Sequence, residues 1–232
     1  MLNRSGSRVA LACAALMALA APAAAQQTLN LSVGLFTPRG EDARVHGDVL
    51  TANRTFLLFD VDEFNGPSVG GEWLVPFGRY VEAGAGLSFT RRTVATIYED
   101  FVDDDGTEID SDLRLRMMPV AFTFRVIPTG QRSLVQPYFG AGLGIINWRY
   151  SEVGEFIDFA AGRAIVRDSY VASGNQAGAL ALGGIRFAGE SISSGFEVRY
   201  QKAEADLDER FAGSKIDLGG WTYNFTFGFR FR

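Results

Sequence analysis

Aromatic and polar side chains alternate along the last twelve residues of this 232-residue chain. Every odd position from Trp221 to Phe231 is aromatic, and every even position from Thr222 to Arg232 is polar or glycine. Successive side chains on a β-strand point to opposite faces, whereas a helix would distribute these rings around its whole axis. The pattern therefore predicts a C-terminal strand with one continuous aromatic face.

Seven earlier segments show the same period of two, with apolar side chains on one face and polar or small ones on the other. Together with the last segment, the predicted strands are residues 29–36, 68–77, 81–91, 113–127, 135–148, 176–187, 195–201 and 221–232. The fourth segment changes phase, because its apolar residues are odd at Leu113 and Leu115 but even from Met118 onward. A β-bulge near Met117 and Met118 is predicted, since one extra residue would restore a single apolar face.

The connections between these segments alternate in length. Short turn-forming sequences lie at residues 76–79, 128–132 and 188–191, and long connections at residues 38–65, 92–112, 150–175 and 202–215. Every short turn falls at the end that carries both termini. This arrangement predicts an all-β fold, an eight-stranded antiparallel, up-and-down transmembrane β-barrel of the bacterial outer membrane. No exported segment has 18 consecutive apolar residues, so no membrane helix is predicted.

The polar faces of the predicted strands indicate which way the barrel is turned. They are rich in glycine, for example at Gly140, Gly142 and Gly144, and small residues suit the crowded interior of a narrow barrel. A soluble ligand-binding barrel with its apolar faces inward is the alternative, which the asymmetry of the loops disfavours. The polar faces also carry charges of both signs that could neutralise one another inside a barrel: Glu72, Glu82, Glu197, Arg114, Arg116, Arg125, Arg186, Arg199 and Arg230.

Amphipathic aromatic side chains near the ends of the predicted strands indicate where the lipid headgroups lie. Trp73, Trp221 and Tyr223 share the parity of the apolar faces, and we expect them in a girdle at the membrane interface. Trp148 and Tyr150 have the parity of the interior face, so a place in the girdle and a place inside the barrel both stay open.

The first 25 residues have the features of a secretory signal peptide. Arg4 and Arg8 precede an apolar stretch that is too short for a membrane helix, and residues 23–25 are alanines that suit a cleavage site. The predicted domains are a cleaved signal at residues 1–25 and a barrel at residues 26–232. Cleavage removes Cys13, the only cysteine, and changes the formal net charge from −5 to −7. An acidic exported chain without a basic run is not expected to bind nucleic acid.

Three further segments carry a resemblance to known proteins. They are Phe64-Asn-Gly-Pro67 followed by Gly70-Gly71, then Gln136-Pro-Tyr-Phe-Gly-Ala-Gly142, and Ile216-Asp-Leu-Gly-Gly220 before the final strand. With the aromatic C-terminal run, they make the exported chain resemble the small eight-stranded outer-membrane barrel proteins, the OmpA- and OmpW-like group. The resemblance implies a fold but no activity. It also implies that the barrel-insertion machinery reads the last strand, although Arg232 stands where such proteins usually have an aromatic residue.

The densest cluster of charge is the acidic segment from Glu99 to Asp112. Carboxylates beside lipopolysaccharide could hold Ca²⁺ or Mg²⁺, which prefer oxygen ligands. A calcium-binding loop with Gly106 at its sixth position would begin at Phe101, where an aspartate is required. We therefore expect a solvated loop that resists edge pairing, and we predict neither metal-ligating nor cofactor-binding residues.

His46, the only histidine, lies in the first long connection. Outer-membrane barrels include lipid A acyl hydrolases and acyl transferases, whose chemistry would need a serine activated by a histidine. A His-x-Ser pair is absent from the predicted strands, while a Ser-His-Asp arrangement assembled from distant loops stays open. We expect His46 to be a plain loop residue, assign no catalytic residue and do not predict an enzyme.

The apolar stretch from Thr55 to Phe64 interrupts the first long connection. It could extend the second strand, cap the barrel mouth, or offer a contact surface to a small molecule or protein. A ninth barrel strand is disfavoured, because it would reverse the end at which every later loop lies. The favoured interpretation is a loop core.

Together these patterns predict a monomeric barrel in the cell outer membrane with periplasmic termini. The expected function is a structural and surface-interaction role through four extracellular loops, with a lumen filled by side chains. A narrow channel or transporter for small solutes is the first alternative, and a lipid A-modifying enzyme the second. The expected partners are outer-membrane lipid, lipopolysaccharide and the barrel-insertion machinery.

Overall fold

The computed structural model describes residues 26–103, 105–158 and 162–231, so the predicted signal peptide lies outside the described residues. Eight long strands dominate the described chain. They are β1 (Gln27–Pro38), β3 (Gly66–Phe77), β4 (Val81–Val102), β5 (Glu108–Val126), β6 (Val135–Asp158), β7 (Ala164–Ala188), β8 (Ile192–Lys202) and β11 (Gly220–Phe231).

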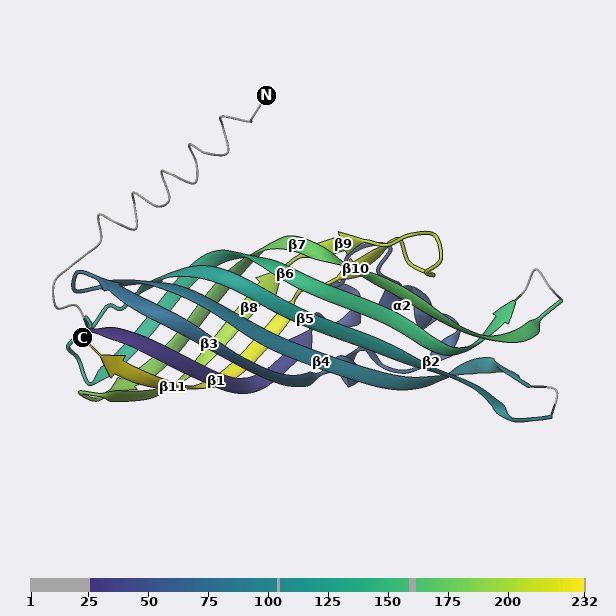
Figure 1. The fold of residues 1–232 in the computed structure, drawn as a ribbon, viewed down its shortest axis with the longest axis horizontal. Coiled ribbons are helices and arrows are strands. Elements are labelled where there is room, and N and C mark those ends of the chain that lie inside the picture. The colour runs from purple at the N-terminus through teal and green to yellow at the C-terminus, as the bar shows by residue number, and fades with distance from the viewer. Residues whose placement is uncertain (1–25, 104, 159–161, 232) are drawn as a thin grey trace, which may run out of the picture.

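These eight strands close into a barrel (Figure 1). Each pairs antiparallel with the next barrel strand, and β1 closes the ring against β11, from Gln27 opposite Phe231 to Pro38 opposite Gly220. The short turns after β3, β5 and β7 lie at the same end as Gln27 and Phe231. The predicted all-β, eight-stranded antiparallel, up-and-down barrel is confirmed. Within the described residues, no helix is both long and apolar enough to cross a membrane.

Four strands extend far beyond the others at the end opposite the termini. β4, β5, β6 and β7 contain 22, 19, 24 and 25 residues, whereas the other four contain 11 or 12. The predicted long loops at residues 92–112 and 150–175 are therefore wrong in extent, because most of both segments lies in two long β-hairpins (Figure 1). The outward apolar face ends before the strand does, so the sequence pattern stops short of the strand.

The other two long connections fold into small elements. Residues 38–65, here named loop 1, contain η1 (Glu41–Ala43), α2 (Val49–Asn53), β2 (Leu57–Leu58) and η2 (Val61–Phe64), while β9 (Glu204–Asp206) and β10 (Lys215–Asp217) form a two-stranded sheet. The Asp48 carboxylate caps α2 by accepting hydrogen bonds from the backbone N–H groups of Leu50 and Thr51. β2 pairs only with β4, so the apolar stretch adds no ninth strand to the closed ring.

β5 keeps one register along the lipid-facing part of its length, so the β-bulge predicted near Met117 and Met118 is wrong. Met117 lies opposite Thr90 of β4 and Val120 lies opposite Leu87, which is the same offset. The pairing of β5 with β6 is also continuous through these residues. Odd-numbered side chains point into the barrel both before and after the supposed bulge: Ile109, Ser111, Leu113, Leu115, Met117, Ala121, Thr123 and Arg125 are all buried.

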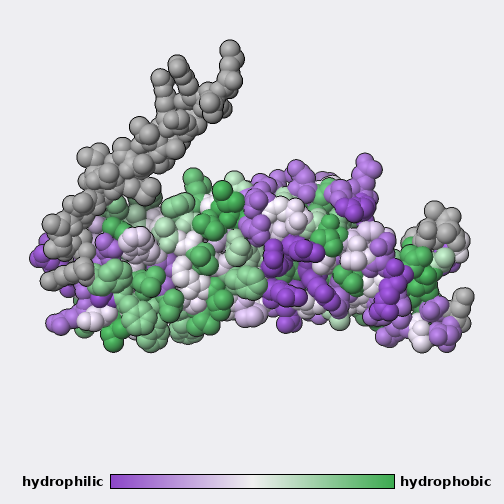
Figure 2. All heavy atoms as spheres, viewed as in Figure 1, coloured by the Kyte–Doolittle hydropathy of each residue, from purple (hydrophilic) through white to green (hydrophobic). Residues whose placement is uncertain are grey.

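The change of phase instead marks the height at which the barrel leaves a lipid-facing band. Toward the short turns, the outer wall of the barrel is apolar and the interior is polar. Toward the long hairpins, the outer wall is polar and the interior is apolar. Figure 2 shows a broad apolar surface over the half of the barrel nearest the termini, with mostly polar surface beyond it. One uninterrupted strand can meet both environments because lipid solvates apolar side chains and water solvates polar ones.

The lipid-facing band consists of large apolar side chains exposed on the outer wall, and it far exceeds the patches that soluble monomers expose. The apolar faces therefore point outward, which excludes the inverted soluble barrel. The band comprises Leu29, Leu31, Val33, Leu35, Val69, Trp73, Phe77, Leu87, Phe89, Met118, Val120, Phe122, Phe124, Val126, Phe139, Leu143, Ile145, Ile185, Phe187, Ile192, Phe196, Trp221, Tyr223, Phe225, Phe227, Phe229 and Phe231.

The amphipathic aromatic residues divide as their parity indicates. Trp73, Trp221 and Tyr223 are exposed on the outer wall, which is where an interfacial girdle requires them. Trp148 and Tyr150 point into the barrel and are buried, which settles the alternative left open by the sequence. These two β6 residues therefore do not belong to the predicted girdle.

Candidate functional site

Six charged side chains converge inside the barrel at the level of the lipid-facing band. Three carboxylates and three guanidinium groups point inward from five strands, and their formal charges sum to zero, as charges removed from water require. Five are buried, and the Arg199 side chain is 23% exposed. These residues, here named the interior charge cluster, are Glu72 on β3, Glu82 on β4, Arg125 on β5, Arg186 on β7, and Glu197 and Arg199 on β8.

Arg125 lies at the centre of the interior charge cluster. Its side chain is 1% exposed. Nη2 forms an ion pair with Glu72 and lies 3.0 Å from Oε2 of Glu197, and Nη1 lies 3.8 Å from Oε1 of Glu82. The guanidinium carbon lies 5.0 Å from the centre of the Tyr138 ring, a cation–π geometry. A single arginine therefore contacts all three carboxylates.

The other two arginines complete the charge balance. Nη2 of Arg199 lies 2.6 Å from Oε2 of Glu72, and the same guanidinium pairs with Glu197. Arg186 donates to both carboxylate oxygens of Glu82, at 3.2 and 2.9 Å. The mutual neutralisation predicted from the sequence is thus present for these six residues.

Neutral side chains supply further hydrogen bonds to the cluster. The hydroxyl groups of Thr123 and Tyr138 each donate to one of its carboxylates, at 2.7 and 3.0 Å. The side-chain oxygen of Gln136 accepts from Arg186 at 2.9 and 2.7 Å. The motif that begins at Gln136 contains both Gln136 and Tyr138, but the sequence predicts no contact with the charged residues for either. Their even parity, shared with the inward glycines of β6, is the signal that would have placed them inside.

Three charged residues predicted for the interior face do not join the cluster. Arg114 and Arg116 point outward from β5, because no bulge brings the even positions of that strand inward. The prediction was wrong for both. Arg230 lies at the short-turn end, where its guanidinium donates to the backbone carbonyl of Gly189 at 2.5 Å.

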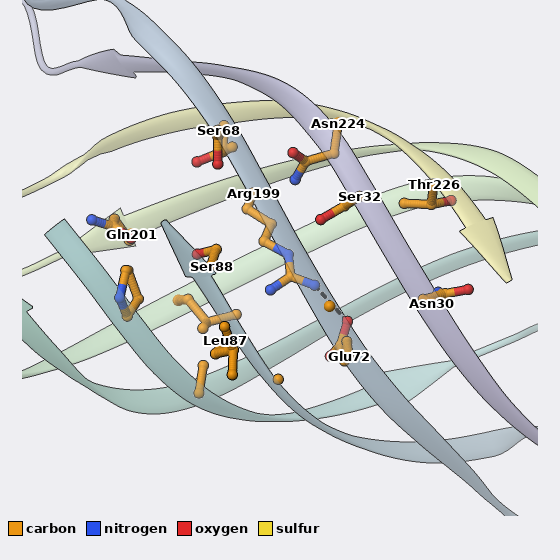
Figure 3. Close-up of a pocket in the computed structure, with 16 residues that line it drawn as sticks. Asn30, Ser32, Ser68, Glu72, Leu87, Ser88, Arg199, Gln201, Asn224 and Thr226 are labelled. Atoms are coloured by element: carbon orange, nitrogen blue, oxygen red, sulfur yellow. Dashed lines mark hydrogen bonds and ion pairs between the residues drawn. The ribbon is translucent and has the colours of Figure 1, made fainter. Parts of the chain in front are cut away.

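A small polar cavity lies beside the ion pair between Arg199 and Glu72 (Figure 3). Its volume is about 40 Å³. One water molecule needs roughly 10–15 Å³ of such space, so the cavity suits a few water molecules and no larger solute. The polar side chains around it include Asn30, Ser32, Ser68, Asn224 and Thr226.

Between the interior charge cluster and the tips of the long hairpins, the barrel interior becomes apolar and loop 1 packs into it. The apolar stretch from Thr55 to Phe64 supplies much of this core, so it caps the barrel mouth from within, as a loop core. Val49, Leu50, Leu57, Phe59, Val61 and Phe64 of loop 1 belong to one buried cluster with Leu113, Leu115, Met117, Ile146, Trp148 and Tyr150 of the barrel wall.

Buried polar contacts hold loop 1 in place. Asp48 accepts hydrogen bonds from the Arg44 guanidinium at 2.5 and 3.0 Å, and from the backbone N–H of Asp217 at 2.7 Å. Arg44 also donates to the backbone carbonyl of Asp217 at 2.9 Å. Loop 1 and β10 are therefore joined by charge-assisted hydrogen bonds, which are the stronger kind.

A second buried contact joins loop 1 to β6. The Asn53 amide donates to the Tyr150 hydroxyl at 3.1 Å and to Oε1 of Glu152 at 2.7 Å, and the same Glu152 oxygen accepts from the Tyr150 hydroxyl at 2.9 Å. None of these partners is a cation. Burial therefore raises the pKa of Glu152 from its ordinary value of 4.5, against the hydrogen bonds that lower it. Burial and the nearby Glu152 also raise the pKa of Tyr150.

Replacing Glu152 with glutamine should stabilise the barrel most at high pH. An acid whose folded pKa is raised binds more protons in the folded state, so stability falls as the pH rises from 4.5 toward the folded pKa. Glutamine keeps an accepting oxygen but cannot ionise. Urea unfolding at pH 4.5 and pH 8 should show a smaller loss of stability in Glu152→Gln than in the wild type. The exposed Glu108→Gln change is the control, and an unchanged pH dependence in Glu152→Gln would contradict the prediction.

The other residues considered as sites remain apart. His46 is exposed in loop 1, and among the described residues no hydrogen bond joins it to a serine or a carboxylate. The acidic segment from Glu99 to Asp112 lies largely in β4 and β5, with Asp105 accepting hydrogen bonds from Thr107 at the hairpin tip. No group of three or more metal-ligating side chains is gathered in residues 26–103, 105–158 and 162–231.

No protein-family model matches the sequence, and no curated protein matches it significantly. The fold is similar to OprG of Pseudomonas aeruginosa, with a TM-score of 0.50, 16% identity, and coverage of 90% of this chain and 97% of that one. Ail of Yersinia pestis has a TM-score of 0.48 and 11% identity, with coverage of 90% of this chain and 100% of that one. Outer membrane protein W of E. coli has a TM-score of 0.40 and 14% identity, with coverage of 90% of this chain and 98% of that one.

At 16% identity the likeness to OprG concerns the fold alone. The closed ring of eight antiparallel strands, the outward apolar faces and the short turns beside the termini agree with it. The chain therefore has the fold of the small eight-stranded bacterial outer-membrane barrels, the group of proteins that its sequence resembles.

Proposed function

We propose that this protein is a closed barrel of the cell outer membrane with a structural and surface-interaction role. Its termini and short turns face the periplasm, and its long hairpins and loop 1 face outward. The barrel contacts outer-membrane lipid and lipopolysaccharide along the lipid-facing band. The insertion machinery reads β11, whose outward face is aromatic up to Phe231.

The observation that carries this proposal is the occupation of the interior at two successive levels. The interior charge cluster crosses the barrel at the level of the lipid-facing band, and Arg125 contacts all three of its carboxylates. The loop 1 core then fills the interior toward the long hairpins. An eight-stranded barrel is only wide enough for its own side chains, so a solute would have to displace both layers.

Cell fractionation tests the location and labelling tests the orientation. We expect the protein in the outer-membrane fraction, with a gel mobility that changes on heating. A single cysteine introduced at Asp105, in a hairpin tip, should react with a membrane-impermeant maleimide on intact cells. A cysteine at Thr129, in a short turn, should react only after the outer membrane is permeabilised. Recovery in the soluble periplasm would overturn the proposal, and the opposite labelling pattern would reverse the orientation.

Conductance measurements separate the closed barrel from the narrow channel. We expect the wild-type barrel to carry no resolvable current in planar lipid bilayers, because Glu82 and Arg199 are engaged with partners. Currents that change in Glu82→Gln or Arg199→Gln would place the conducting path through the interior charge cluster and would support transport instead. For the lipid A-modifying alternative, lipid A mass profiles with and without His46→Ala are the test, and we expect no difference.

A further inference from the structure

Four arginines form a contiguous patch on the outer wall of the barrel. Arg91 of β4 lies directly opposite Arg116 of β5, which on its other side lies opposite Arg149 of β6. Arg114 lies two residues before Arg116 on β5 and therefore on the same face of that strand. Three guanidinium-bearing residues thus stand side by side across three neighbouring strands, with a fourth beside them. They are here named the arginine row.

This arrangement is unfavourable unless something else balances it. Like charges directly opposite in a sheet destabilise the pairing of strands. The whole chain has a formal net charge of −5. Within the described residues, however, the arginine row forms only one ion pair, in which Nη2 of Arg114 lies 2.7 Å from Oδ2 of Asp112. Arg116 donates to the Asn147 amide oxygen at 3.1 Å. Within the described residues, no carboxylate lies at ion-pair distance from Arg91, Arg116 or Arg149.

The arginine row has the accessibility and the unused donors of a binding site. A groove of about 410 Å³ lies along it, lined by all four arginines together with Ser151 and Ser169. Arg91 and Arg149 are exposed on the outer wall. Since no carboxylate of the described chain pairs with them, these two side chains are open to an acceptor supplied from outside the protein.

The position of the row identifies the acceptor. Phe89 and Met118 lie two residues from Arg91 and Arg116 along the same strands, and both are exposed apolar members of the lipid-facing band. The row therefore begins where the acyl chains end, at the height of the lipid headgroups. Arginine binds phosphate through paired hydrogen bonds. A free anion would use the arginines alone, whereas a phosphorylated lipid would use both the arginines and the apolar wall beside them.

The geometry points to the arginine row as a binding site for the phosphate groups of an outer-leaflet glycolipid of the lipid A class. The lipid phosphates would neutralise the facing guanidinium groups, and the acyl chains would lie along β4 and β5. This inference rests on the proposed orientation, in which the long hairpins face outward. It adds a defined headgroup site to a general lipid contact.

Titration of the refolded mature barrel in zwitterionic micelles tests the site. The probes are diphosphoryl lipid A, the same lipid after removal of its phosphates, and inorganic phosphate. The test variant is R91Q/R116Q/R149Q. The control, R163Q/R167Q/R210Q, removes the same charge from exposed positions on the long hairpins and the loop between β9 and β10. Heat-modifiable mobility confirms that each variant is folded.

We expect the Kd for diphosphoryl lipid A to rise about tenfold or more in the test variant and less than about twofold in the control. The reason is that each lost charge-assisted hydrogen bond removes a large part of the binding free energy. Without lipid, the test variant should resist urea at least as well as the wild type, because facing like charges are gone.

Three results would each overturn the assignment: equal weakening in both triple variants, equal binding of the phosphorylated and phosphate-free lipids, or inorganic phosphate binding as tightly as the lipid. Cell-surface labelling tests the orientation separately, so a failure identifies which of the two proposals is wrong.

Discussion

Replacing Arg125 with methionine is expected to lower the free energy of unfolding by about 3–5 kcal/mol, the usual cost of leaving a buried charge without its partner. Arg125 contacts Glu72, Glu82 and Glu197, and the variant would leave three carboxylates facing two arginines. Methionine is unbranched and replaces the aliphatic stem of arginine, so the loss reports mainly on the missing guanidinium group. Equilibrium unfolding in urea, with the barrel in lipid vesicles, measures it.

The matched control restores the balance of charge. In Arg125→Met combined with Glu197→Gln, the interior again has equal numbers of carboxylates and guanidinium groups. A large part of the lost stability should therefore return, since replacing a whole buried ion pair is often nearly neutral. A double variant less stable than Arg125→Met alone would show that the interior charge cluster does not work by mutual neutralisation.

Introducing arginine at Phe227 is expected to cost about 2–4 kcal/mol, the penalty for a basic side chain at the middle of the lipid-facing wall of a barrel. Phe227 is 60% exposed on the outer wall and lies near the middle of β11. The penalty comes from removing a charge from water into lipid. Unfolding in vesicles, compared with Phe227→Leu, separates this effect from the loss of an aromatic ring.

The same substitution near the membrane surface is the control for arginine at Phe227. Phe231 lies at the short-turn end of the same outward face, opposite Gln27. Arginine there should cost only about 0–1 kcal/mol, because its guanidinium reaches the headgroup region. Equal costs at Phe227 and Phe231 would mean that β11 does not cross the lipid as assigned.

The alternation of side chains was sufficient to predict β11 and its continuous aromatic face, whereas the outward direction of that face was predicted from the asymmetry of the loops and the inward glycines. The period of two is a local property, fixed by the pleat of each strand. Connection lengths then supplied the antiparallel order, because short turns can join only neighbouring strands. Six of the nine charged residues that were predicted for the interior face belong to the interior charge cluster, because alternate positions of a strand point to the same face.

The segment around Met117 shows where sequence reasoning failed. A bulge and a change of surroundings both shift the apolar positions of a strand by one residue, so the pattern alone cannot separate them. The register with β4 and β6 does so, since both pairings run through Met117 without a shift. The outward placement of Arg114 and Arg116, and with it the arginine row, follows from that register alone.

The sequence by itself determined the class of fold, the number of strands and the face that meets lipid, because these depend on the order of residues within each strand and on the lengths of the connections. Only the tertiary structure decided which charges meet, that loop 1 fills the barrel mouth, and that four strands continue beyond the lipid-facing band. These features depend on how strands far apart in the chain are aligned. That alignment is set by barrel closure, a property of all eight strands together.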